Sequence, residues 1–106
     1  MNIQQLIVNN LEENKAQDII SLDIRKLTDI ADYMIIASGT STRHLKSLAK
    51  HVVDNLKENG YSILGIEGEK ESEWILIDAE SVIINLMLPE TRKFYELEKL
   101  WNGETY

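Results

Sequence analysis

The stretch IIASGTSTRH, residues 35–44, joins an apolar segment to an amphipathic one through four small residues. The apolar segment, 33–37, has the composition of a buried β-strand. Beyond the small residues, apolar side chains recur on one helix face for about four turns: Leu45, Leu48, Ala49, Val52, Val53 and Leu56. A strand that passes into a long helix through a Ser-Gly turn predicts an α/β fold and raises the question of a phosphate site.

The flanking sequence predicts the remaining elements: a helix over the first dozen residues, strands at 18–24, 62–66, 74–78 and 82–87, and a last helix from Pro89 through Tyr95, Leu97 and Leu100 toward Trp101. Gly60 suits the left-handed position that ends the long helix. That helix is long enough for a crossover, whereas 79–81 is short enough for a hairpin. We therefore predict an α/β fold with a mixed sheet and packed helices, in the order α-β-β-α-β-β-β-α, as a single domain over residues 1–106.

Length and composition define the class of protein. At 106 residues the chain is large enough for one core and too small for two. It has no cysteine, which excludes disulfides, thiol nucleophiles and Cys-rich zinc sites. Its apolar runs are far shorter than the roughly 20 residues that cross a bilayer, and its first residues lack the features of a signal peptide. We expect a cytoplasmic protein with no membrane partner.

The formal charge of −7 argues against nucleic acid as the main partner, because phosphate binding requires a positive field. Much of the charge lies between Glu67 and Glu80, where six acidic residues face Lys70 alone. This segment is either a solvated loop or a surface that attracts a basic partner. The cations of the long helix are solvated or touch RNA phosphates at the edge of a larger contact: Arg43, Lys46, Lys50 and Lys57.

The turn Ser38-Gly39-Thr40-Ser41 has two interpretations. Its backbone N–H groups could hold an anion, or Ser41 or Thr40 could simply cap the helix. Neither known glycine-rich phosphate motif is present. A nucleotidyltransferase using this turn would need paired carboxylates for two metal ions, and the chain contains no Asp-x-Asp. His44 and His51, about 10.5 Å apart on one helix, are too distant to share a metal. We predict no catalytic residue, metal or cofactor.

Trp74 starts a predicted strand in the most acidic part of the chain. It either covers the core or anchors a protein partner, as aromatic residues ringed by charge often do. Strand alternation places Trp74 and Leu76 on one side and Ile75 and Ile77 on the other. Both sides are apolar, so at least one of them must be covered, either by a helix of the same chain or by a partner.

In its order of motifs the chain resembles the ribosomal silencing factor family, RsfS or Iojap-like, across nearly its whole length. The motifs that carry the resemblance are Lys15 with Asp18-Ile19, Leu22-Asp23, Asp32-Tyr33-Met34-Ile35-Ile36, Ser38-Gly39-Thr40-Ser41, Arg43-His44, Gly60, Glu67-Gly68, Trp74-Ile75-Leu76-Ile77-Asp78, Arg92 and Tyr95-Glu96-Leu97-Glu98-Lys99-Leu100-Trp101. Each is weak by itself, but the order and spacing are specific to the family.

The resemblance implies a nucleotidyltransferase-like fold without the carboxylates of the enzyme, and therefore no enzymatic activity. It also implies a repressor that binds large-subunit ribosomal protein fourteen, blocks subunit joining and represses translation when nutrients are short. We expect Trp74 to anchor that contact, Ile75 and Ile77 to supply apolar contact or support, and acidic side chains to meet basic groups: Glu67, Glu73 and Asp78. A minor contact with ribosomal RNA and a homodimer off the ribosome are further expectations.

Two positions depart from the family pattern. Ile84-Asn85 stands where Val-His is usual, so a titratable group is lost while hydrogen-bonding capacity is kept. Asp78-Ala79-Glu80-Ser81 replaces a turn that commonly contains glycine. Both departures lie near the expected partner surface, and they bear on its contacts more than on the function.

Overall fold

The computed structural model describes residues 2–96. Its elements, in chain order, are α1 (Ile3–Glu13), β1 (Gln17–Asp23), β2 (Tyr33–Ser38), α2 (Thr42–Glu58), β3 (Gly65–Glu67), β4 (Trp74–Asp78), β5 (Val82–Met87) and α3 (Pro89–Tyr95). The predicted order and α/β fold class are confirmed. The part of the last predicted helix beyond Glu96 lies outside the described residues.

The strand predicted at 62–66 is wrong at its start, since β3 begins only at Gly65. Gly65 pairs with Asp78, which is the last residue of β4. Residues 62–64 therefore run past the end of their neighbouring strand, and only the Leu64 N–H still reaches the Asp78 carbonyl, at 2.8 Å. An apolar sequence cannot form a ladder where the partner strand has ended.

The sheet has the order β1-β2-β5-β4-β3. Its central pair, β2 and β5, is parallel, and the other three pairs are antiparallel, which confirms the predicted mixed sheet. The segment 79–81 forms the predicted tight connection between β4 and β5. The Ala79 N–H closes it by donating to the Val82 carbonyl at 3.0 Å. Helix α2 carries the chain past β5 and β4 to the far edge of the sheet.

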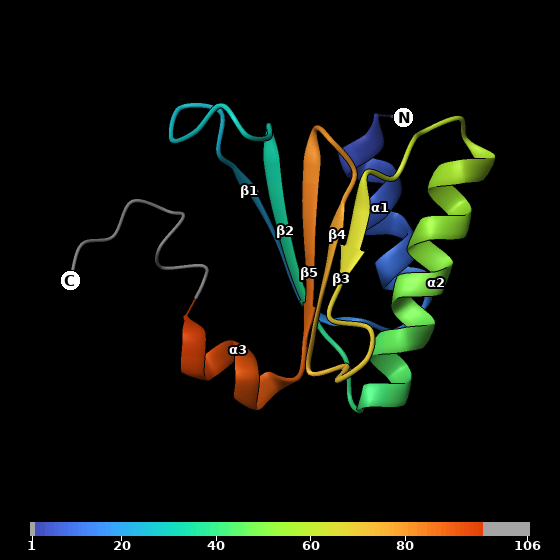
Figure 1. Cartoon of the computed structure of the whole chain (residues 1–106), viewed down its shortest axis with the longest axis vertical. Helices are drawn as coiled ribbons and strands as arrows, with labels where there is room; N and C mark the ends of the chain where they lie inside the picture. Colours follow the sequence, from blue (N-terminus) through green and yellow to red (C-terminus); the bar gives the residue numbers. More distant parts are fainter. Residues whose placement is uncertain (1, 97–106) are drawn as a thin grey trace.

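The two faces of the sheet are covered unequally. Figure 1 shows α1 and α2 on one side and the short α3 on the other. The main core lies under α1 and α2, where Leu45, Leu48 and Leu56 of α2 pack against the inner sides of β2, β4 and β5. A second, smaller cluster lies on the opposite side: Ile24, Ala31, Met34, Ile36 and Met87. This side of the sheet therefore has the thinner helical cover.

Candidate partner-binding surface

The turn at 38–41 uses its backbone donors inside the protein. The Gly39 N–H donates to the Met87 carbonyl at 3.2 Å, and the Thr40 N–H donates to Nδ1 of His44 at 3.0 Å. Ser41 is the N-cap of α2, and its hydroxyl accepts the His44 N–H at 3.1 Å. These contacts are those of a capped helix start, the second of the two interpretations drawn from the sequence.

Packing against α2 disfavours a side chain at Gly39. A Cβ added there would lie 2.7 Å from Cδ2 of Leu45, in the first turn of α2. His44 is also structural, because Nδ1 accepts from Thr40 and Nε2 therefore carries the proton donated to the Asn14 carbonyl, at 3.0 Å. This imidazole ties the start of α2 to the end of α1. Within residues 2–96 no group of three or more His, Asp or Glu side chains is arranged to hold a metal ion.

The open side of the sheet over β3, β4 and β5 is defined by strand register. Directly paired residues share a side, and the pairs are Trp74 with Met87, Leu76 with Asn85, and Glu67 with Leu76. Asp78 follows Leu76 on the same side. We call the side chains of Glu67, Trp74, Leu76 and Asp78 the Trp74 face.

Trp74 is half-buried, and two contacts orient its ring. The indole Nε1–H donates to Oδ1 of Asn85 at 2.7 Å. The ring also lies against Tyr95 of α3, with centroids 4.9 Å apart and planes tilted by 52°. Phe94, which is 80% exposed, contacts Tyr95 edge-on at 5.1 Å. Three aromatic rings thus meet where β4 begins and α3 ends.

Ile75 and Ile77 do not belong to this surface. Both side chains are 0% exposed and lie in the main core beneath α1 and α2. Of the two roles expected for them, apolar contact or support, their burial fits support of β4 from behind, because the helices of the same chain already cover them. Leu76, half-buried on the opposite side, occupies the position from which contact can be made. Alternation separated these residues correctly, but it did not show which side the helices cover.

The acidic side chains predicted for the site are spread along β4, from Glu73 just before Trp74 to Asp78 at the other end of the strand. Glu67 and Asp78 share the face of Trp74, and Glu73 is exposed one residue before the strand. The Asp78 carboxylate accepts the Glu80 N–H at 3.0 Å. In the part of the chain that the structure describes, the ion pairs are Arg25–Asp23 and Lys50–Asp54. Neither of these two ion pairs includes Glu67, Glu73 or Asp78.

A loop between β1 and β2 borders the same side of the sheet. Its Ile24 and Ala31 belong to the smaller core cluster, and Figure 1 shows the loop and α3 at opposite ends of this side. Leu27 and Ile30 are exposed on it. At its start, hydrogen bonds from Arg25 lower the pKa of Asp23 to about 2. Sequence analysis missed these two apolar residues and Phe94, since their exposure depends on the fold.

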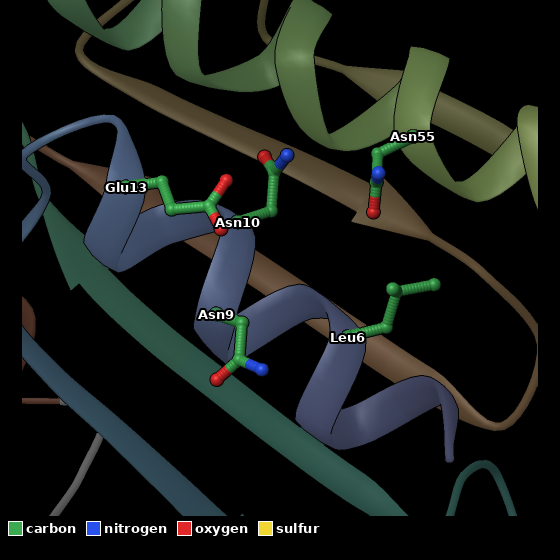
Figure 2. A pocket seen from close by; sticks show the side chains of 5 residues that line it. All are labelled: Leu6, Asn9, Asn10, Glu13 and Asn55. Carbon is green, nitrogen blue, oxygen red and sulfur yellow. The ribbon is translucent and has the colours of Figure 1, made fainter. Parts of the chain in front are cut away.

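A polar hollow of about 150 Å³ lies on the other side of the molecule, between α1 and α2. Its lining residues are Leu6, Asn9, Asn10, Glu13 and Asn55. Figure 2 shows Asn10 directed from α1 toward α2. The Oδ1 atom of Asn10 is buried without a hydrogen-bond partner. An unpaired buried amide oxygen costs stability.

We expect Asn10→Leu to raise the free energy of unfolding by about 1 kcal/mol, since it removes the unpaired oxygen and favours the helix. Asn10→Ala provides the matched control, because it also removes the amide but does not fill the hollow. Urea denaturation should show Asn10→Leu to be the most stable, followed by Asn10→Ala and then the wild type. A loss of stability in Asn10→Leu would show that the amide is satisfied within the hollow.

The fold and the Trp74 face define a small α/β protein with an acidic and aromatic sheet face that α1 and α2 do not cover. The chain belongs to the ribosomal silencing factor family: residues 2–105 match the family described as "Ribosomal silencing factor during starvation", RsfS. A Chromobacterium violaceum ribosomal silencing factor RsfS is 45% identical over 102 residues, 96% of this chain and 84% of that protein. The Haemophilus influenzae factor is 34% identical and matches 95% and 99% of the two chains.

Solved structures agree with this assignment. A crystal structure of a Chromobacterium violaceum protein superposes with a TM-score of 0.93 at 44% identity, covering 98% of this chain and 87% of that one. Family membership implies ribosome-associated regulation of translation. The relatives carry names of regulatory factors rather than of enzymes. None of the helices in residues 2–96 has the length and apolarity needed to cross a bilayer.

Proposed function

We propose that this protein silences ribosomes by occupying the large subunit through its Trp74 face. The partner is large-subunit ribosomal protein fourteen, and the bound protein sterically blocks the small subunit and represses translation, typically under nutrient limitation. The observation that carries the proposal is a half-buried tryptophan, held in one orientation on a sheet face that the helices leave open. Oriented aromatic residues of this kind are common anchors of protein interfaces.

The negative charge of the Trp74 face favours a basic partner. Glu67, Glu73 and Asp78 lie along and beside β4, the strand of Trp74, and the chain as a whole carries a formal charge of −7. Such a field accelerates encounter with a positively charged surface and disfavours phosphate backbones. The buried Ile75 and Ile77 support the strand from behind, so the contact is made by Trp74 and Leu76.

Residues 1–106 act as one RsfS-like domain in the cytoplasm, without a cofactor. Ribosomal RNA is touched at most at the edge of the contact, since the exposed cations Arg43 and Lys46 lie on α2, across the sheet from Trp74. Off the ribosome the protein self-associates; residues 101–106, one candidate for that contact, lie outside the described residues.

Co-sedimentation with separated ribosomal subunits over a salt series tests the proposal. We expect the protein to pellet with large subunits only, and binding to weaken as salt rises, because salt screens the acidic face. Failure to pellet with large subunits at low salt would contradict the proposal.

Neutralising the acidic residues should weaken that binding and flatten its salt dependence. We expect Glu67→Gln with Asp78→Asn to lower the affinity about threefold to tenfold, as exposed ion pairs contribute roughly 0.2–1 kcal/mol each. Glu12→Gln with Glu58→Gln is the matched control, since it removes the same charge from α1 and α2 on the opposite side. Equal losses in both double variants would mean that only net charge matters, and not this face.

A further inference from the structure

The hydrogen bond between Trp74 and Asn85 is consistent with only one orientation of the Asn85 amide. An indole Nε1–H can only donate, so the Asn85 atom 2.7 Å away must be its carbonyl oxygen, Oδ1. The other end of the amide, Nδ2, then faces Sδ of Met34, a weak acceptor. Asn85 is 1% exposed and lies on β5, one strand away from Trp74. The amide is therefore fixed from both ends.

The hydrogen bond to Asn85 also restricts the orientation of the Trp74 ring. Trp74 packs against the apolar cluster that includes Met34 and Met87, and an apolar surface alone would hold an indole in more than one orientation. A hydrogen bond to the ring nitrogen selects one of them, and Tyr95 closes the ring from the side of α3. An aromatic side chain that is ordered before binding loses less conformational freedom when it docks.

We propose that Asn85 is a positioning residue, which holds the Trp74 indole in the one orientation that docks against a protein partner. Asn85 itself is buried and touches no partner. It acts through Trp74, so its effect on binding depends on the indole nitrogen. The inference rests on the proposed function only for the identity of the surface that docks.

The first test needs no partner. The chain has two tryptophans, so a ¹H–¹⁵N spectrum contains two indole resonances, and Trp74→Phe identifies that of Trp74. In the wild type we expect this N–H to exchange with solvent slowly. Asn85→Leu removes the acceptor and should shift the resonance and speed exchange at least about tenfold. Asn85→His, of similar size to leucine but with an acceptor nitrogen, should restore much of the protection. An unchanged Trp74 resonance in Asn85→Leu would overturn the proposal.

The second test is a double-mutant cycle for binding to purified large subunits. Asn85→Leu should weaken binding about threefold to tenfold, the range expected when one side chain must be ordered on docking. In a Trp74→Phe background, which has no indole N–H, the same substitution should have no further effect. Equal losses in both backgrounds would indicate a general packing defect and overturn the proposal.

The result also separates this inference from the proposed function. If Trp74→Ala binds large subunits normally, the proposed face is wrong, whatever the indole resonance does. If Trp74→Ala abolishes binding while Asn85→Leu frees the indole without weakening binding, the face stands and the positioning role is rejected. Melting temperatures of each variant confirm that all of them are folded at the temperature of measurement.

Discussion

Trp74→Ala is expected to weaken binding to the large subunit about thirtyfold or more, the equivalent of about 2 kcal/mol for a central aromatic anchor. The substitution removes the ring that lies against Tyr95 and the cover that Trp74 gives to the smaller core cluster. It also leaves Oδ1 of Asn85 without its donor. Co-sedimentation or calorimetry with purified large subunits measures the effect, and normal affinity would show that the partner does not dock on the Trp74 face.

The same change lowers stability, and the two effects need separating. A buried acceptor that loses its donor costs roughly 1–3 kcal/mol. Leu6→Ala is a suitable control because Leu6 is half-buried and packs on the helix side of the sheet, away from Trp74. We expect Leu6→Ala to lower the melting temperature without altering affinity. Loss of binding in both variants would point to instability as its cause.

Gly68→Ala is expected to cause the largest loss of stability, at least about 3 kcal/mol. Gly68 has φ +85, which a residue with a side chain adopts only with strain, and an added Cβ would lie 2.0 Å from the Trp74 carbonyl oxygen. That oxygen belongs to the backbone of β4, so the clash cannot be relieved by rotating a side chain. The strand that presents Trp74 must move instead.

Gly60→Ala provides a matched control for Gly68→Ala. Gly60 has nearly the same φ, +83, but nothing lies within 4 Å of an added Cβ. We expect this substitution to cost only the backbone strain, about 1 kcal/mol. Urea denaturation of both variants isolates the steric part as their difference. Equal losses would mean that the turn at 68 relaxes without displacing β4.

Much of the fold could be predicted from the sequence because its signals are local. Helix α2 shows this best: apolar periodicity, a serine N-cap and a glycine with positive φ mark its course, start and end. The predicted start of β3 is too early because the limits of a strand depend on its partner strand. Residues 62–64 lie beyond the end of β4. The helix predicted beyond Glu96 stays a prediction, since it lies outside the described residues.

The candidate site was only partly accessible to sequence reasoning. Trp74, its acidic neighbours and the alternation of Ile75 with Leu76 follow from the order of residues along one strand. Their separation onto two sides of the sheet is therefore a property of the sequence alone. The tertiary structure decided which side of the sheet α1 and α2 cover. Because they cover the side of Ile75 and Ile77, those two side chains are buried and Leu76 faces the other side.

The sequence by itself determined the family, the order of elements and the chemical character of the surface, because these depend on local spacing and composition. The tertiary structure decided that Asn85 of β5 lies beneath Trp74 of β4 and that Tyr95 of α3 closes over the same ring. It also decided that the Ser38–Ser41 turn uses its donors internally, through Met87 and His44. Except for the local bond between Thr40 and His44, these contacts join different strands or helices, and such pairing is set by how the sheet and helices pack together.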